Sequence, residues 1–237
     1  MKNIYVIIPA VNEEQSIGKV IRAISLKTVK EIIVVDNGSD DDTINAAKKN
    51  GATVLQETER GYGAACLKGL EYIFAKCSPD DIIVFLDGDY SDYPEEMIDL
   101  VTPIIDSDYD FVVGSRIMGK KHGRAGSGAL LPQAIFGNWL STKLIKIIWN
   151  YSFTDLGPFR AIKATALKNM KMKDRNFGWT VEMQIKASKM NLKCKEIPVS
   201  YRKRIGKSKV TGTVAGSVKA GIIIISTIFS HTLKKSP

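Results

Sequence analysis

Residues 82–89 read IIVFLDGD, five apolar side chains that lead directly into Asp87, Gly88 and Asp89. An uninterrupted apolar run of this length predicts a strand that is buried on both faces of a parallel sheet. The two carboxylates would then lie at its C-terminal end, the edge where open α/β sheets bind ligands. Paired acids around a glycine suit a hard divalent cation shared with phosphate oxygens. The alternative is an acidic turn, because Asp and Gly are common turn residues.

Two earlier segments repeat this pattern. The apolar residues 4–8 precede the stretch PAVNEE at 9–14, and the apolar residues 32–35 precede DNGS at 36–39. Each predicts a strand that ends in a polar loop before a helix. Three such strand ends, alternating with helical patterns, predict an α/β fold with a doubly wound sheet and a site along one edge. A nucleotide is the ligand expected at such a site.

The composition indicates one catalytic domain followed by a tail. The chain has 237 residues, of which 44% are apolar, and no linker rich in Pro, Gly or Ser interrupts it. Its three cysteines show no metal-binding spacing, so we expect reduced thiols in a cytoplasmic setting. Met1 and Lys2 lead into a strand pattern rather than into the apolar region of a signal peptide.

The positive charge is concentrated in the C-terminal quarter. Residues 193–237 contain ten Lys or Arg and one acid, Glu196, and so carry the whole formal charge of +9. Such asymmetry indicates an anionic partner: a membrane surface, a lipid phosphate or nucleic acid. We do not expect nucleic acid, because basic and aromatic residues do not alternate there.

Two apolar stretches have an open interpretation. Residues 213–229 are too short in their apolar core to predict a transmembrane helix and fit a basic, apolar helix lying among lipid headgroups. The alternative is a terminal helix that packs on the domain or in a homodimer interface. Residues 136–148 form another amphipathic stretch with the same two interpretations.

Eight motifs, taken together, resemble a known family. Five of them resemble the nucleotide-sugar half of glycosyltransferase family 2: PAVNEE (9–14), VVDNGSDDDT (34–43), GYGAA (61–65), LDGDYSDYPEE (86–96) and GSR (114–116). The acceptor half of enzymes related to dolichyl-phosphate mannose and glucose synthases is similar to TDLGPFRAI (154–162), GWTVEMQIKA (178–187) and RKRIGKSKVTGT (202–213). The resemblance covers roughly residues 4–212 and is specific through the order and spacing of the motifs.

The resemblance implies a Rossmann-like glycosyltransferase A fold with a mostly parallel central sheet and a C-terminal basic, apolar helix. It divides the chain into a catalytic domain at 1–212 and a membrane-associating or packing helix at 213–237. Within the catalytic domain, residues 1–116 would form the nucleotide-sugar half and residues 117–212 the acceptor half.

The resemblance also implies the donor site. The residues that would contact the nucleotide sugar are Pro9, Val11, Glu13, Val35, Asp36, Asn37, Gly61, Asp87, Gly88 and Asp89. Many relatives have a second acid where this chain has Asn37, so the choice between UDP and GDP stays open. The metal, Mg²⁺ or Mn²⁺, would be held by Asp89 directly, while Asp87 would hold either the ribose or the water shell of the ion, and Ser91 would be a weaker ligand beside water.

On the acceptor side, the predicted catalytic residues are Asp155, Arg116, Arg160 and Glu182, and the predicted phosphate-binding residues are Arg202, Arg204 and Lys209. A hydroxyl acceptor would need a general base, for which Asp155 is the first choice. A polyprenyl phosphate is already anionic near neutral pH and needs cations instead.

The sequence therefore predicts an inverting, metal-dependent glycosyltransferase that moves a hexose from a nucleoside diphosphate to a polyprenyl (dolichyl) phosphate. The enzyme would be cytoplasmic and peripheral to the cytoplasmic face of a membrane. Three alternatives remain open: transfer to a hydroxyl of a saccharide or small metabolite, a nucleotidyltransferase, and a non-enzymatic basic binding protein. A nucleotidyltransferase would have no evident use for the motifs at 154–162 and 178–187.

Overall fold

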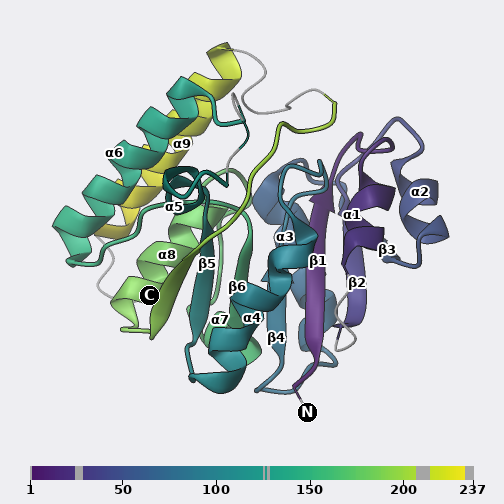
Figure 1. Ribbon diagram of the computed structural model, residues 1–237, viewed down its shortest axis with the longest axis horizontal. Coiled ribbons are helices and arrows are strands. Elements are labelled where there is room, and N and C mark those ends of the chain that lie inside the picture. Colours follow the sequence, from purple (N-terminus) through teal and green to yellow (C-terminus); the bar gives the residue numbers. More distant parts are fainter. Residues whose placement is uncertain (1, 25–28, 125, 127–128, 207–213, 233–237) are drawn as a thin grey trace.

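One seven-stranded sheet organises the protein, in the order β3-β2-β1-β4-β6-β5-β7 (Figure 1). The computed structural model describes residues 2–24, 29–124, 126, 129–206 and 214–232. The strands are β1 (Ile4–Ala10), β2 (Val29–Asp36), β3 (Thr53–Gln56), β4 (Ile82–Phe85), β5 (Phe111–Ser115), β6 (Arg160–Lys163) and β7 (Cys194–Pro198). Strand β6 runs antiparallel to both its neighbours, and the other pairs are parallel. The predicted α/β fold with a mostly parallel sheet is confirmed.

Helices cover both faces of this sheet. They are α1 (Ile17–Ala23), α2 (Thr43–Lys49), α3 (Tyr62–Phe74), η1 (Pro94–Glu96), α4 (Met97–Asp106), α5 (Arg116–Lys121), α6 (Pro132–Trp149), α7 (Ala164–Met170), α8 (Trp179–Lys189) and α9 (Val214–Thr232). Alternate residues of β1 enter different clusters: Ile7 packs with α3 and α8, whereas Val6 packs with α1 and α4. Burial on both faces explains why the strands are continuous apolar runs.

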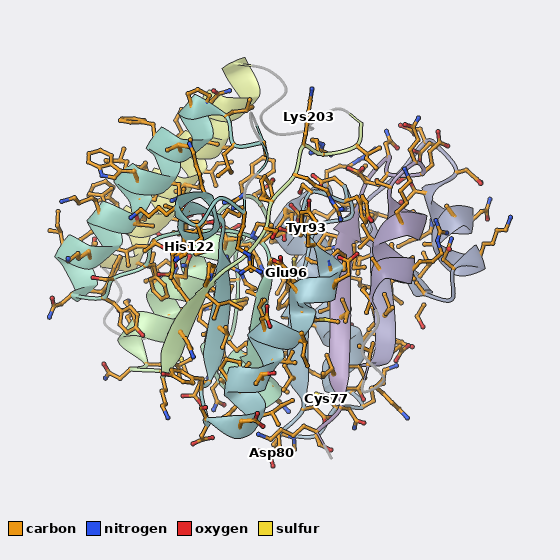
Figure 2. The ribbon with its side chains drawn as sticks, in the orientation of Figure 1. Cys77, Asp80, Tyr93, Glu96, His122 and Lys203 are labelled. Carbon is orange, nitrogen blue, oxygen red and sulfur yellow. The ribbon has the colours of Figure 1, made fainter. Side chains whose placement is uncertain are left out.

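The strand directions bring the polar loops to one edge. Because β1, β2 and β4 are parallel, the loops that follow them leave the sheet at the same end. The antiparallel β6 begins at that end with Arg160, so the preceding segment 154–159 arrives there too. Figure 2 shows Lys203 at this end of the molecule and Cys77 and Asp80 at the opposite end. Both halves of the chain therefore contribute to one site.

The C-terminal helix packs on the protein. Helix α9 lies beside α6 (Figure 1) and also contacts α8. Its Ile228 is completely buried in the core cluster. Among the helices that the structure describes, we find none with the length and apolarity needed to cross a membrane. The flanking lysines at 207, 209, 234 and 235 lie outside the described residues.

The glycines at the start of α3 allow close packing. The amide of Gly63 donates to Asn176 O at 3.2 Å, and the amide of Ala64 donates to Arg175 O at 2.9 Å. A Cβ at Gly63 would overlap the carbonyl oxygen of Asp174. The start of α3 is therefore bonded to the 174–176 loop, and small residues are required for that contact.

Replacing Gly63 with Ala should destabilise the protein by about 1–3 kcal/mol, because the new methyl group must displace backbone rather than a side chain. The matched control is Gly137→Ala in α6, where a Cβ has open space; it should gain roughly 0.5–1 kcal/mol from helix propensity. Chemical denaturation measures both changes. Equal effects of the two substitutions would contradict the packing role of Gly63.

Candidate active site

A first cavity, of about 360 Å³, lies where the loops after β1, β2 and β4 meet the start of α3. We call it the donor cavity. The predicted nucleotide-sugar residues that line it are Pro9, Val11, Glu13, Asn37, Gly61, Asp87, Gly88 and Asp89. Ala10, Asn12, Tyr62 and Ala65, which also line it, belong to the motifs at 9–14 and 61–65 without having been predicted individually; the other lining residues are Arg60, Phe177 and Arg204, the last from the predicted acceptor segment.

Val35 and Asp36, at the end of β2, do not line the donor cavity but hold the strand end and the turn that follows it. Val35 is completely buried in the strand, and the carboxylate of Asp36 accepts the amides of Gly38 and Ser39 in the following turn. The side chain of Asn37 donates to the carbonyls of Glu57 and Glu59 at 3.0 and 2.7 Å and accepts from Gly61 N at 2.7 Å. A carboxylate could not donate to those two carbonyls, which explains an amide at this position.

Three acids gather at the end of β4. Burial, followed by the nearby carboxylate of Asp89, raises the pKa of Asp87 to about 7. Burial and then the Asp87 and Asp89 charges raise the pKa of Asp92 well above its usual range. Close carboxylates in a dry site repel one another, and a cation between them would relieve that repulsion.

The oxygen atoms at this place fit a hard divalent cation. Asp87 Oδ1 and Ser91 Oγ are buried without a hydrogen-bond partner among the described residues. The described part of the chain contains no group of three or more His, Cys, Asp or Glu side chains in metal-binding geometry. Substrate phosphate oxygens would therefore have to complete the coordination of an ion bound here.

A segment of the predicted acceptor half, residues 202–205, borders the donor cavity through Arg204. Arg204 donates from one nitrogen to Glu13 Oε1 at 2.7 Å and pairs through the other with Asp89 Oδ2 at 3.2 Å. The segment is held by the amide of Ile205 on Asp89 O and the amide of Arg202 on Ser91 O, both at 3.0 Å. A predicted acceptor residue thus lies against the predicted metal ligand.

The other two residues predicted to bind the acceptor phosphate have different positions. The guanidinium carbon of Arg202 lies 3.5 Å from the ring centre of Tyr90 and 4.0 Å from that of Tyr93. Its nitrogens donate to the carbonyls of Tyr90 and Asp92. Arg202 therefore fastens residues 202–205 to the loop after β4, and Lys209 lies outside the described residues.

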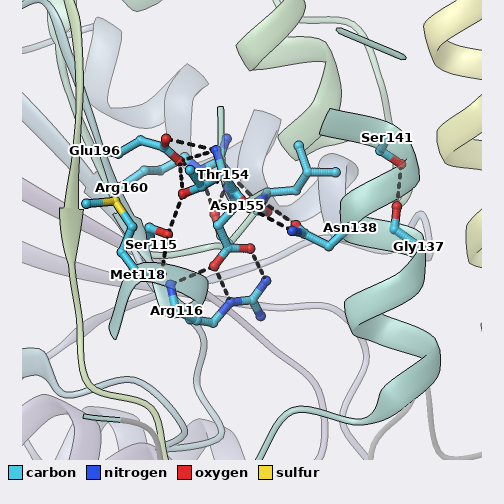
Figure 3. A network of polar contacts seen from close by, with 12 residues as sticks. Ser115, Arg116, Met118, Gly137, Asn138, Ser141, Thr154, Asp155, Arg160 and Glu196 are labelled. Atoms are coloured by element: carbon cyan, nitrogen blue, oxygen red, sulfur yellow. Dashed lines mark hydrogen bonds and ion pairs between the residues drawn. The ribbon is translucent and has the colours of Figure 1, made fainter. Parts of the chain in front are cut away.

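Arg116 and Asp155 form a buried ion pair (Figure 3). Ser115 caps α5 by accepting the amide of Met118, so Arg116 is the first residue of that helix. Asp155 Oδ2 accepts from Arg116 N at 2.7 Å and Nε at 2.8 Å, and Oδ1 accepts from Nη2 at 2.8 Å. Burial opposes the charge of Arg116, but attraction to Asp155 outweighs it and raises the pKa of the guanidinium.

Asp155 is itself held in place. The carboxylate of Glu196 on β7 accepts the amides of Thr154 and Asp155 (Figure 3). Asn138 of α6 donates to Thr154 O and accepts from Leu156 N at 2.8 Å. Both oxygens of Asp155 are thus engaged with Arg116, and its position is that of an orienting partner rather than of an open general base.

A second cavity, of about 260 Å³, adjoins the first. We call it the acceptor cavity. Tyr62, Asp87 and Phe177 line both cavities, and Arg116 lines only the second of them. Its remaining walls come from α6, the start of α8, α9 and the 156–158 segment: Gln133, Ala134, Gly137, Asn138, Leu156, Pro158, Thr180, Ala220, Gly221 and Ile224. Arg116 and Asp87 are its charged lining residues, and the rest of the lining is mostly small or apolar, with Gln133, Asn138 and Thr180 as polar members.

The structure does not bring Arg160 and Glu182 to either cavity lining. Arg160 is completely buried and donates to the carbonyls of Leu156, Gly157 and Thr180, and burial lowers its pKa to about 10. Glu182 pairs with Lys186 at 2.9 Å and accepts the amide of Asp174 at 2.7 Å. Glu182 is paired with Lys186, and the guanidinium of Arg160 is bonded to backbone carbonyls, so both side chains have their partners inside the fold. The catalytic role expected of these two residues is not supported by where they lie.

Comparison with known proteins places these features in context. The family described as Glycosyl transferase family 2 matches residues 5–170. An uncharacterized glycosyltransferase of Mycobacterium tuberculosis is 32% identical, over 91% of this chain and 93% of that protein. A dolichyl-phosphate hexose transferase of Haloferax volcanii is 28% identical, over 97% and 95%.

A similar fold occurs in a solved structure. The crystal structure of glucosyl-3-phosphoglycerate synthase from Mycobacterium tuberculosis, in complex with Mn²⁺, uridine diphosphate and phosphoglyceric acid, superposes with a TM-score of 0.76 at 22% identity. The likeness covers all of this chain and 80% of that one.

Replacing Asp87 with Asn should stabilise the metal-free protein at pH 8 relative to wild type. The unfolded chain ionises Asp87 near pH 4, whereas the folded protein keeps the proton until about pH 7. Wild type therefore loses stability as the pH rises through this window, and the Asn variant does not. The difference should grow from pH 4 to pH 7 and then level off.

Thermal unfolding in the presence of a chelator measures this difference. Asp80→Asn, an exposed position at the opposite end of the molecule, controls for the loss of one charge (Figure 2). A difference between Asp87→Asn and wild type that does not change with pH would contradict the environment described for Asp87.

Proposed function

The chain belongs to glycosyltransferase family 2, as its motifs indicated, and on that premise we propose that it transfers a hexose from a nucleoside diphosphate to a polyprenyl phosphate with inversion. The observation that carries the proposal is the acceptor cavity, which begins at Arg116 and Asp87 and continues between α6 and α9. A polyprenyl phosphate matches this lining, because it has a charged phosphate monoester at one end and an apolar chain beyond it. The Haloferax relative, named for dolichyl phosphate, supports the same acceptor class.

The donor cavity would hold the nucleotide sugar. Its edge supplies Glu13, oriented by Ser16 at 2.9 Å, as an acceptor for ribose hydroxyls. Asp87, Asp89 and Ser91 would hold Mg²⁺ or Mn²⁺, which neutralises diphosphate charge and stabilises the departing nucleoside diphosphate when bound. Arg204 balances Glu13 and Asp89 in the ligand-free protein, so its ion pairs compete with any cation that binds there.

The acceptor phosphate would bind Arg116. Asp155 fixes the guanidinium through two hydrogen bonds, which makes the arginine a rigid ligand for a phosphate oxygen. Such a phosphate is already ionised near neutral pH and can attack the anomeric carbon without a general base. Asp87 lies on the wall shared by the two cavities, where donor sugar and acceptor would meet. These two substrates meet at a membrane surface, and we place the enzyme at the cytoplasmic face.

Replacing Asp89 with Asn should reduce transfer by more than about tenfold, because it removes ligand charge from the cation without altering volume. Transfer of labelled hexose from a panel of nucleotide sugars, titrated with Mg²⁺ and Mn²⁺, measures the effect. Asp80→Asn is the control and should behave as wild type. Activity above a tenth of wild type with unchanged metal dependence would remove Asp89 from the proposed metal site.

Asp155→Asn tests the acceptor class. With a phosphate acceptor, the loosened Arg116 should raise the acceptor KM, and kcat should fall by less than the roughly 10²–10⁴-fold expected for loss of a general base. Arg116→Lys should change KM in the same direction, because it weakens the same contact. Calorimetry with nucleoside diphosphate and metal should show unchanged donor binding in both variants.

The opposite pattern would overturn the lipid-phosphate proposal. If Asp155→Asn mainly lowers kcat at saturating acceptor, and if the acidic limb of the pH–rate profile disappears with it, Asp155 is a base. The acceptor would then be a hydroxyl of a saccharide or small metabolite.

A further inference from the structure

The exposed apolar side chains gather on two neighbouring helices. Around α6 and on α9, the large apolar side chains that remain exposed are Leu131, Phe136, Trp139, Ile147, Ile222 and Phe229. Elsewhere in the described residues, only Ile98 and Ile105 of α4 are comparably exposed. An apolar surface of this kind, concentrated on adjacent elements, marks a contact with another apolar phase. We call it the α6–α9 face.

The spacing along α6 produces a single stripe. Phe136, Trp139, Lys143, Lys146 and Ile147 recur at three- and four-residue intervals and are all exposed. The rings of Phe136 and Trp139 lie 5.9 Å apart between centroids. The core-facing side of the helix is different, because Ser141, Thr142 and Ile145 are buried there. Helix α6 therefore has one side that packs on the core and an exposed side that is apolar and basic.

The charge of this face is of one sign. Neither the 132–149 helix nor the 214–232 helix contains an Asp or Glu. The exposed Lys143 and Lys146 lie among the apolar residues of α6. Tryptophan and lysine beside bulky apolar side chains are typical of helices that lie in the headgroup region of an anionic bilayer. The partner that this composition fits is thus a lipid surface with negative charge.

The α6–α9 face and the acceptor cavity share two helices. The same two helices that carry the exposed apolar residues line that cavity, through Gly137 and Asn138 of α6 and Gly221 and Ile224 of α9. A Cβ at Gly137 or Gly221 would meet no atom within 4 Å, so small residues leave room between the helices. An acceptor whose phosphate reaches Arg116 could therefore extend between α6 and α9 toward this surface.

We propose that the α6–α9 face docks on the surface of an anionic phospholipid bilayer, with α6 as the principal anchor and the acceptor cavity opening toward the lipid. The purpose of this docking rests on the proposed function. The docking surface itself is inferred from the exposed apolar side chains and from the positive charge of the face. The sequence left the same two interpretations open for residues 136–148 and 213–229, and in this proposal both helices take part: α6 contributes Phe136, Trp139 and two exposed lysines, and α9 contributes Ile222 and Phe229.

Cosedimentation with vesicles of phosphatidylglycerol and phosphatidylcholine tests the surface. Phe136→Glu combined with Trp139→Glu should weaken binding by more than about tenfold, since burial of even one such ring contributes that much. The matched control is Ile98→Glu combined with Ile105→Glu on α4, which replaces two exposed apolar side chains outside the face with the same two charges and should bind as wild type. Equal loss in the two double variants, or no loss in the first, would overturn the proposal.

The lysines give a second, electrostatic readout. Lys143→Gln and Lys146→Gln should each weaken binding to the anionic vesicles by about fivefold. Binding to vesicles of phosphatidylcholine alone should be weak and should not respond to either change. If the full chain binds both kinds of vesicle equally, the charge assignment is wrong.

Two further measurements separate the outcomes. If the face instead joins two copies, analytical ultracentrifugation without lipid should show a dimer that the Phe136→Glu, Trp139→Glu variant dissociates, and vesicle binding should be absent. Transfer to a short, water-soluble prenyl phosphate should be retained by that variant when only docking is lost. If neither wild type nor any variant transfers hexose to the soluble prenyl phosphate, while wild type still binds the vesicles, the proposed function is contradicted and the docking surface is not.

Discussion

The rest of the site depends on one constraint: Asp87, Asp89 and Asp92 are held close together, at the end of β4, where water is scarce. Like charges in such a place require compensation. Two arginines provide it from different parts of the chain, Arg116 at the start of α5 and Arg204 from the segment after β7. Each arginine borders a different cavity, so the acids link the donor side to the acceptor side.

The strand ends could be predicted from sequence because apolar runs followed by polar loops have one arrangement in a parallel sheet. Asp87, Asp89 and Glu13 accordingly line the donor cavity. What could not be predicted is which partner each charge finds across the fold. Glu182 pairs with Lys186 one turn along its own helix, and Arg160 satisfies three carbonyls, so neither reaches the substrate cavities. Helical spacing permits the pair of Glu182 with Lys186, but the motif gives no indication that this pair is buried inside the fold, or that Arg160 donates to carbonyls instead of facing a substrate.

The same limit applies to the acceptor side. A motif identifies Asp155 as an acid near the site, but only the folded chain shows that Arg116 occupies both its oxygens and that Glu196 and Asn138 hold its loop. Asn138 belongs to α6, which also carries the exposed Phe136 and Trp139. Helix α6, which would contact the lipid, therefore also positions the loop of Asp155. That loop holds Arg116, the residue that would bind the lipid phosphate.

The central claim is that the nucleophile is a lipid-linked phosphate, and the identity of the product tests it most directly. The protein would be incubated with a nucleotide sugar, a divalent metal and polyprenyl phosphate, and the product examined by phosphorus and proton NMR. We predict a single phosphodiester between the anomeric carbon of the hexose and the polyprenyl phosphate, with the anomeric configuration opposite to that of the donor. Hexose found on a hydroxyl oxygen, with the lipid phosphate unchanged, would contradict the account.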